Sequence, residues 1–269
     1  MTFSDNGMPG LGIGLWTWEH LSHEAVIRKC GILILTMSEK AAGKTINRFS
    51  WKIFKRLVGG KSLARILVNL FAAQFSVGGE IVDLGSKSSS GSYHRALRFI
   101  QPYKIVHTDL YAAEPDVMAL DLEQPFPLSD ATQDVVLCFN VLEHLFNAPQ
   151  ALRESCRILK PGGRMIGAVP FFVRYHPDPH DYFRYTHEAL RRMAESAGFE
   201  VENITALGLG PFTAGASLIG VYLPGLLRAV CHACAAALDW LLGKLRKSNA
   251  IVEPLAYGFV FTKPNTSKA

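Results

Sequence analysis

Two acidic side chains follow apolar segments in a way that suits a nucleoside site. Asp109 lies near the end of the β-branched run 105–111, which predicts a buried strand. An acid at the carboxyl end of such a strand can accept hydrogen bonds from both ribose hydroxyls of a bound nucleoside. Further along, the carboxylate of Asp121 and the backbone amide of Leu122 can meet the edge of a purine. These residues predict a nucleoside site at the carboxyl edge of a sheet.

A turn of small residues follows the apolar run 81–84, which contains a third acid, Asp83. Gly85 comes next, and small residues there let the backbone turn sharply and let a ligand approach it closely. From His94 the apolar spacing predicts a helix, which completes a strand–turn–helix unit. The dinucleotide pattern G-x-G-x-x-G is absent, because Lys87 stands at the second glycine position. An ordinary βα turn without a ligand is the alternative.

The pair Glu143 and His144 comes just after a strong apolar strand, VVLCFN, at the edge where open α/β sheets keep their sites. We expect His144 to act as a general base, with Glu143 beside it, if the reacting group is a hydroxyl. The alternative is structural: Glu143 favours the positive end of a short helix, and His144 packs against the bound ligand.

A proline-broken loop, FFVRYHPDPHDYFRYTHEALRRM (171–193), crowds polar side chains after a further strand. A metal site made by His176 and His180 with Asp178 or Asp181 is disfavoured, since the flanking prolines impose an extended backbone. We therefore expect no metal. A pairing of Asp181 with Arg184 is the modest alternative. The preferred interpretation is substrate recognition, by His180, Asp181, Tyr182 and Arg184.

The elements that must position these residues can be read from the same patterns. Strands are expected at 81–84, 105–111, 135–140, 199–208 and 256–264, with one more after the break Pro161-Gly162-Gly163. Thr186 is expected to cap a helix that follows it.

Residues 45–75 predict two basic, amphipathic helices that cap the main domain. An anionic membrane surface or nucleic acid is the alternative partner for such a basic face. Residues 209–245 form a nearly all-apolar insertion, interrupted by Pro224, Arg228 and Asp239. We expect a helical pair that covers the substrate pocket or makes a homodimer contact. The alternative is a surface that dips into a membrane to reach a lipid-linked acceptor.

The composition describes a globular protein: of 269 residues, 49% are hydrophobic and 19% are charged, with a formal net charge of +5. Five cysteines show no paired framework, which fits a reducing, cytoplasmic compartment. The apolar patch 31–35 is too short for a signal core or a membrane span. Residues 1–36 are expected to be disordered or a non-native extension, with Met37 as the true start.

Taken together, the blocks IVDLG, HTDLY, DLEQPFPLSDATQDVVLCFNVLEHL, LRESCRILKPGGRMIGAVP and AGFEVE resemble the class I S-adenosylmethionine-dependent methyltransferases, in their small-molecule branch. The resemblance covers about residues 78–205. It implies a Rossmann-like, seven-stranded, mostly parallel sheet with flanking helices and an antiparallel last strand. It also implies S-adenosyl-L-methionine as cofactor, bound by Asp83, Gly85, Ser86, Asp109, Leu110, Asp121, Leu122 and Asn140. The chain departs from the family's glycine motif at Lys87 and Ser89.

We therefore expect an α/β fold with an N-terminal helical cap (37–77) and a methyltransferase domain (78–269) carrying the insertion at 209–245. The expected function is methyl transfer to a small-molecule, glycan or lipid-linked acceptor, with oxygen as the target atom and no nucleic acid as substrate. The expected localisation is cytoplasmic. The alternative, which the apolar insertion suggests, is peripheral attachment to the inner face of the membrane. The rivals are a non-catalytic scaffold of the same fold and, last, a nicotinamide-dependent enzyme.

Overall fold

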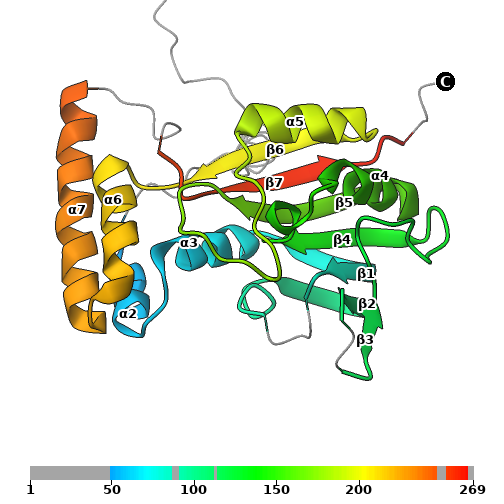
Figure 1. The fold of residues 1–269 in the computed structure, drawn as a ribbon, viewed down its shortest axis with the longest axis horizontal. Helices are drawn as coiled ribbons and strands as arrows, with labels where there is room; N and C mark the ends of the chain where they lie inside the picture. Colours follow the sequence, from blue (N-terminus) through cyan, green and yellow to red (C-terminus); the bar gives the residue numbers. More distant parts are fainter. Residues whose placement is uncertain (1–48, 87–90, 112–113, 247–252, 266–269) are drawn as a thin grey trace, which may run out of the picture. The chain divides into compact units, whose positions relative to one another are not determined.

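A seven-stranded sheet, in the order β3-β2-β1-β4-β5-β7-β6, carries the fold (Figure 1). The computed structural model describes residues 49–86, 91–111, 114–246 and 253–265. Strands β1 to β5 pair in parallel, and β7 pairs antiparallel with both β5 and β6. The predicted mostly parallel, Rossmann-like sheet is confirmed. The strands are β1 (Ser76–Leu84), β2 (Arg98–Asp109), β3 (Val117–Ala119), β4 (Gln133–Phe139), β5 (Leu159–Pro170), β6 (Glu200–Leu207) and β7 (Ala256–Thr262).

Helices cover both faces of the sheet, and each face has its own apolar core. On one face, α4 and α5 bury side chains such as Leu152 and Leu190 against β4 and β5. On the other, α3 places the ring of Phe71 so close to Gly258 of β7 that an added Cβ there would lie 2.7 Å from it. The helices are α2 (Trp51–Val58), α3 (Leu63–Ala72), α4 (Ala148–Ile158), α5 (His187–Ser196), α6 (Pro211–Ile219) and α7 (Gly225–Arg246).

The helix expected from His94 is wrong. The chain makes one turn, in which the amides of Ala96 and Leu97 both donate to the carbonyl of Tyr93, and then enters β2 at Arg98. The reason is that β1 already begins at Ser76. Because Ser76 pairs with Arg98, the apolar residues that follow Arg98 adopt a strand conformation. Similarly, the break expected at residues 161–163 falls inside β5 and appears as a shift in register with β4.

The cap and the insertion form helices as expected, and they lie against each other. Ser50 and Ser62 cap α2 and α3 by accepting from backbone amides, at Ile53 and Arg65. Gly225, at the start of α7, approaches α2 so closely that an added Cβ would lie 2.1 Å from the carbonyl oxygen of Val58.

Asp239, in the middle of α7, links the two helices of the insertion, α6 and α7. Its carboxylate accepts the amides of Phe212 and Thr213 at 2.8 and 2.9 Å, so it caps the start of α6. α7 runs as one helix through Arg228 and Asp239, the two charged residues that interrupt its apolar sequence. By length and composition alone α7 could cross a membrane, and 22% of that segment is buried. The residues 1–36, the start of the cap to residue 48, Lys87 and Ser89 lie outside the described residues.

Candidate functional site

The carboxyl ends of β1, β2 and β4 meet at a pocket of about 400 Å³. This is the edge at which open α/β sheets bind their ligands. Six of the eight residues expected to bind cofactor line it, together with the expected base and two residues of the loop after β5. In order along the chain they are Gly85, Asp109, Leu110, Asp121, Leu122, Asn140, His144, His180 and Tyr182.

The two acids expected to hold a nucleoside are each fixed by a backbone amide two residues further on. Asp109 Oδ1 accepts from the amide of Tyr111 at 3.1 Å, and Asp121 Oδ1 accepts from the amide of Glu123 at 2.9 Å. Among the described residues, neither acid makes a second side-chain hydrogen bond. Each carboxylate therefore keeps one oxygen for a bound group, which suits the two hydroxyls and the purine edge of a nucleoside.

The turn after β1 leaves room for a ligand because of Gly85. Its φ is +64°, in the left-handed region that favours glycine, and a Cβ there would lie 3.0 Å from Val141 Cγ2. The amide of Gly85 donates to Thr108 Oγ1 at 3.3 Å, which ties the turn to the end of β2. The backbone at Gly85, which carries no side chain, lies in the same pocket as the two fixed carboxylates. This arrangement suits S-adenosyl-L-methionine, so the residues present can accommodate the expected cofactor.

Asp83 has a different environment from the other acids, because its side chain is fully buried. Both of its oxygens accept from the Tyr93 hydroxyl, at 3.0 and 3.1 Å, and its Oδ2 is hydrogen-bonded to His94 Nε2. Burial, aided by the Asp83 charge, raises the pKa of Tyr93 far above its usual range. Ser86 is bonded to His107, at 2.9 Å. Asp83 thus anchors the segment after the turn, and a direct role of Asp83 or Ser86 in cofactor binding stays a prediction.

The pair expected to be catalytic is split between the pocket and the interior. His144 lines the pocket, whereas the side chain of Glu143 is fully buried behind it. His144 Nδ1 faces the carbonyl oxygen of His180, and His144 Nε2 lies 3.7 Å from Glu143 Oε1. The Glu143 carbonyl accepts the amide of Tyr182 at 2.8 Å, so the loop after β5 is fastened to this turn.

The loop after β5 separates the four residues expected to recognise substrate into two pairs. His180 and Tyr182 line the pocket, whereas Asp181 and Arg184 form a two-pronged ion pair with Nη2 to Oδ2 at 2.7 Å. Asp181 also accepts the amide of His176 at 2.9 Å. The Arg184 guanidinium is the main cause that lowers the pKa of Asp181 to about 2. The pairing of Asp181 with Arg184, the modest alternative, is present, and it braces the loop.

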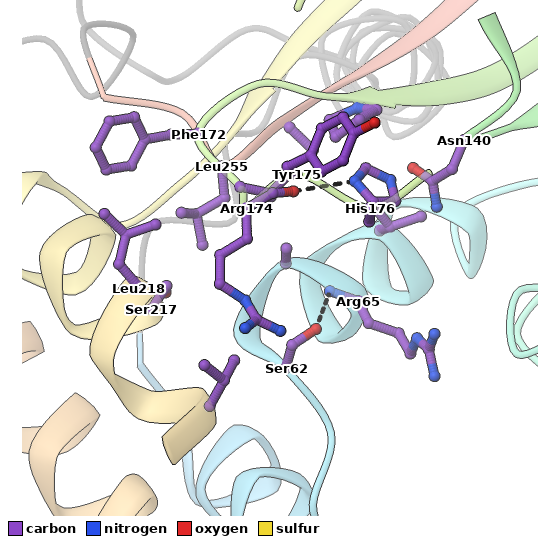
Figure 2. Close-up of a pocket in the computed structure, with 16 residues that line it drawn as sticks. Ser62, Arg65, Asn140, Phe172, Arg174, Tyr175, His176, Ser217, Leu218 and Leu255 are labelled. Atoms are coloured by element: carbon purple, nitrogen blue, oxygen red, sulfur yellow. Dashed lines mark hydrogen bonds between the residues drawn. The ribbon is translucent and has the colours of Figure 1, made fainter. Parts of the chain in front are cut away.

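A second pocket, of about 320 Å³, lies on the other side of Asn140 (Figure 2). Asn140 lines both pockets and has a φ of +56°, a conformation that asparagine tolerates better than most residues. Figure 2 shows His176 beside Asn140 and the side chain of Arg174 pointing into the space between α3 and α6. The wall combines α3, the loop after β5 and α6, with Arg65, Val68, Phe172, Arg174, His176, Ser217 and Leu218 among its residues.

The arginines of this second pocket were missed by sequence reasoning. Arg174 carried a weak signal, since it lies in the loop already singled out, but Arg65 lies on a helix whose basic residues resemble an ordinary solvated face. They meet only because the tertiary structure places α3 and the loop after β5 around one cavity.

Comparisons with known proteins agree with this geometry. Residues 88–167 match the family described as a methyltransferase domain. A probable S-adenosylmethionine-dependent methyltransferase of Mycolicibacterium smegmatis is 36% identical over 83 residues, which cover 29% of this chain and 32% of the relative. A ubiquinone biosynthesis O-methyltransferase of Thiobacillus denitrificans is 30% identical over 97 residues, which cover 30% of this chain and 42% of the relative. The chain therefore spans less than half the length of these relatives.

Among solved structures, a putative methyltransferase from Bacillus halodurans aligns with 16% identity over 74% of this chain and 98% of that one, at a TM-score of 0.46. The matched domain covers the part of the chain that forms β2 to most of β5, and it contains most of the residues that line the first pocket. The chain therefore contains a segment that matches a methyltransferase domain, and it is similar to S-adenosylmethionine-dependent methyltransferases over about a third of its length.

Proposed function

We propose that this chain transfers a methyl group from S-adenosyl-L-methionine to an oxygen atom of a small-molecule, glycan or lipid-linked acceptor. The observation that supports this proposal most is the meeting of two pockets at Asn140. One pocket has the carboxylates and bare backbone that suit the cofactor. The other shares only Asn140 with it and is separate enough to hold an acceptor.

S-adenosylmethionine supplies a methyl group that is already activated, so alignment and exclusion of water carry much of the catalysis. In this proposal, Asp109 and Asp121 hold the nucleoside, and Asn140 lies at the methyl-bearing end. For an acceptor hydroxyl a proton must also leave, and the imidazoles of His144 and His176 flank the junction. The relative named as an O-methyltransferase also favours oxygen as the target atom.

The acceptor pocket suits an acceptor with a negatively charged group. Arg65 and Arg174 are in its wall, and no carboxylate side chain is among the lining residues. A guanidinium is well suited to bind phosphate or carboxylate because it presents several donors in one plane. We therefore propose that the acceptor carries such a group next to the hydroxyl that is methylated.

The lipid-linked option rests on the outer face of α7. Figure 1 shows α7 running beside α6 and α2, and α6 supplies Ser217 and Leu218 to the acceptor pocket. A stripe of apolar side chains on α7 is 44% to 75% exposed, namely Leu227, Val230, Leu238, Leu241 and Leu245. Such a stripe on a monomer is a feature of surfaces that bind membranes or other proteins.

The charges around this stripe favour an anionic lipid surface as the occupant. In the described helices α2, α3, α6 and α7, the one acidic residue is Asp239, and it is buried. Lys244 lies 3.9 Å from the ring centre of the exposed Trp240, and Lys55 lies 5.6 Å from that of Trp51. Lysines beside exposed tryptophans are typical of helices that lie in a membrane interface.

Calorimetric titration with S-adenosylmethionine and S-adenosylhomocysteine is the experiment that tests the cofactor half of the proposal. One site with micromolar affinity is the expected result. A folded protein that binds neither compound would favour the non-catalytic scaffold instead.

Sedimentation with vesicles tests the membrane half. We expect binding to vesicles that contain phosphatidylglycerol, weaker binding to phosphatidylcholine alone, and loss of binding in Leu227→Ser/Leu238→Ser. The matched control is Ile100→Ser, which changes an exposed apolar residue of β2. If the double variant instead halves the mass in solution and leaves vesicle binding unchanged, the stripe is a homodimer contact.

A further inference from the structure

A buried carboxylate with no partner lies between the two pockets. The side chain of Glu143 is fully buried, and neither of its oxygens has a hydrogen-bond partner among the described residues. A buried charge without compensation is costly, so a native protein is expected to place a cation or a donor beside it. The nearest groups are the Nε2 atoms of His144 and His176, at 3.7 and 3.6 Å from Oε1. Both distances exceed that of a hydrogen bond.

The opposite nitrogen of each imidazole determines what these Nε2 atoms offer. His144 Nδ1 contacts the carbonyl oxygen of His180, and His176 Nδ1 lies 3.1 Å from the carbonyl oxygen of Arg174. A carbonyl can only accept, so each Nδ1 must carry the proton and donate it. In the neutral form, both Nε2 atoms then present lone pairs toward the same carboxylate. A cation bound between these three electron-rich groups would compensate all of them at once.

The spacing suits a metal ion. With bonds of about 2.0–2.2 Å from zinc to nitrogen or oxygen, neighbouring ligands lie roughly 3.0–3.5 Å apart. The observed separations of 3.6 and 3.7 Å need only small shifts of the side chains. The backbone carbonyls that fix the two rings are the outer partners that metal-bound histidines usually have.

We propose that Glu143, His144 and His176 form a binding site for a divalent transition-metal ion such as Zn²⁺. Two imidazoles and one carboxylate suit zinc and its neighbours, whereas magnesium and calcium prefer oxygen ligands alone. Three protein ligands also leave a coordination position open, as in catalytic metal sites. This site differs from the set of His176, His180 and an aspartate considered from the sequence.

A second cluster shows why the orphaned carboxylate matters. Asp83, His94 and His107 also have potential ligand atoms within 4.8 Å of one another. There, however, the carboxylate is already hydrogen-bonded to His94 and to the Tyr93 hydroxyl. That cluster is satisfied without an ion, so no metal is proposed for it.

The position of the site indicates which further ligand a metal ion bound there would take. His144 belongs to the wall of the first pocket and His176 to that of the second, so the open position lies near the junction at Asn140. If the proposed function holds, a metal there would bind the acceptor's hydroxyl oxygen and lower its pKa, which makes the oxygen a better nucleophile. This step rests on the proposed function, but the metal site itself does not.

Metal binding without any methyl acceptor is the test. Chelator-treated full-length protein is titrated with zinc chloride against a coloured zinc chelator, and we expect one tightly bound ion. Glu143→Gln and His176→Asn should each weaken binding by about 100-fold or more, because each removes a direct ligand. His180→Ala should bind normally, because its contribution to the site is a backbone carbonyl, and His107→Asn should also bind normally. Thermal unfolding of each apo variant verifies that it is folded.

Absence of stoichiometric zinc binding by the wild-type protein would overturn the proposal, and so would unchanged binding in Glu143→Gln. In either case the imidazoles would remain as general bases alone. If the wild-type protein binds zinc but not S-adenosylmethionine, the proposed function is contradicted and the metal site is retained. The two failures are therefore distinguishable.

Discussion

Removal of the Asp109 carboxylate should weaken cofactor binding by an amount that the structure allows us to work out. Asp109 is 9% exposed, and one of its oxygens is already engaged by the amide of Tyr111 at 3.1 Å. At least one oxygen therefore remains for a ribose hydroxyl. A hydrogen bond to a charged group contributes about 1.5–3 kcal/mol. Asp109→Ala should accordingly raise the dissociation constant of S-adenosylhomocysteine about 10- to 150-fold.

The assay is calorimetric titration, with Asp109→Asn as the matched variant. Asparagine keeps an oxygen that can accept from Tyr111, so it preserves the turn and removes only the charge. Asp116→Ala, which changes an exposed acid near the same edge, controls for general electrostatics. If Asp109→Ala is folded and binds the ligand as tightly as the wild type, the nucleoside does not lie against β2, and the assignment of the first pocket is refuted.

Two further predictions concern stability. Asp239→Ala should lower the free energy of unfolding by about 1–2 kcal/mol in urea denaturation, because the amides of Phe212 and Thr213 lose their hydrogen-bond acceptor. An unchanged midpoint would mean that the stability of α6 does not depend on Asp239. For Asp134, burial opposes the charged form, but hydrogen bonds from Lys160 and the amide of Glu80 outweigh it and lower the pKa. The stabilisation that Asp134 provides is therefore present above its unfolded pKa of 3.8 and declines as the pH falls through the lower folded value, so Asp134→Asn should destabilise the protein more at pH 7 than at pH 2. Equal destabilisation at both pH values would contradict this.

Much of the sheet could be predicted because its signals are local. The run that ends in Phe139 is buried along nearly its whole length, and the run that ends in Asp109 is buried over its last three residues, so their composition alone identifies them. The error at His94 has the opposite origin. The residues that follow it have helical spacing, but the pairing of Arg98 with Ser76 on β1, a contact across the sheet, decides their conformation. Short apolar runs are ambiguous until such a contact is known.

The site shows the same division between local and non-local information. Asp109 and His144 were found because each lies at the end of a predicted strand, and the topology brings the ends of parallel strands together. The environment of Glu143 could not be found in this way. That environment includes His176, 33 positions away, whose Nε2 lies 3.6 Å from Glu143 Oε1, and the carbonyl of His180, which contacts the neighbouring His144.

The two pockets also differ in how much a family resemblance can say about them. The matched segment, 88–167, contains most of the residues that line the cofactor pocket, whereas the acceptor pocket takes its walls from α3, from the loop after β5 and from α6. These parts lie outside the match and carry Arg65 and Arg174, and α7, which carries the apolar stripe, lies outside it too. If the second pocket holds the acceptor, as proposed, relatives that share only the matched segment can have different acceptors. The identity of the acceptor must therefore be sought through Arg65, Arg174 and α7, and not through the cofactor site.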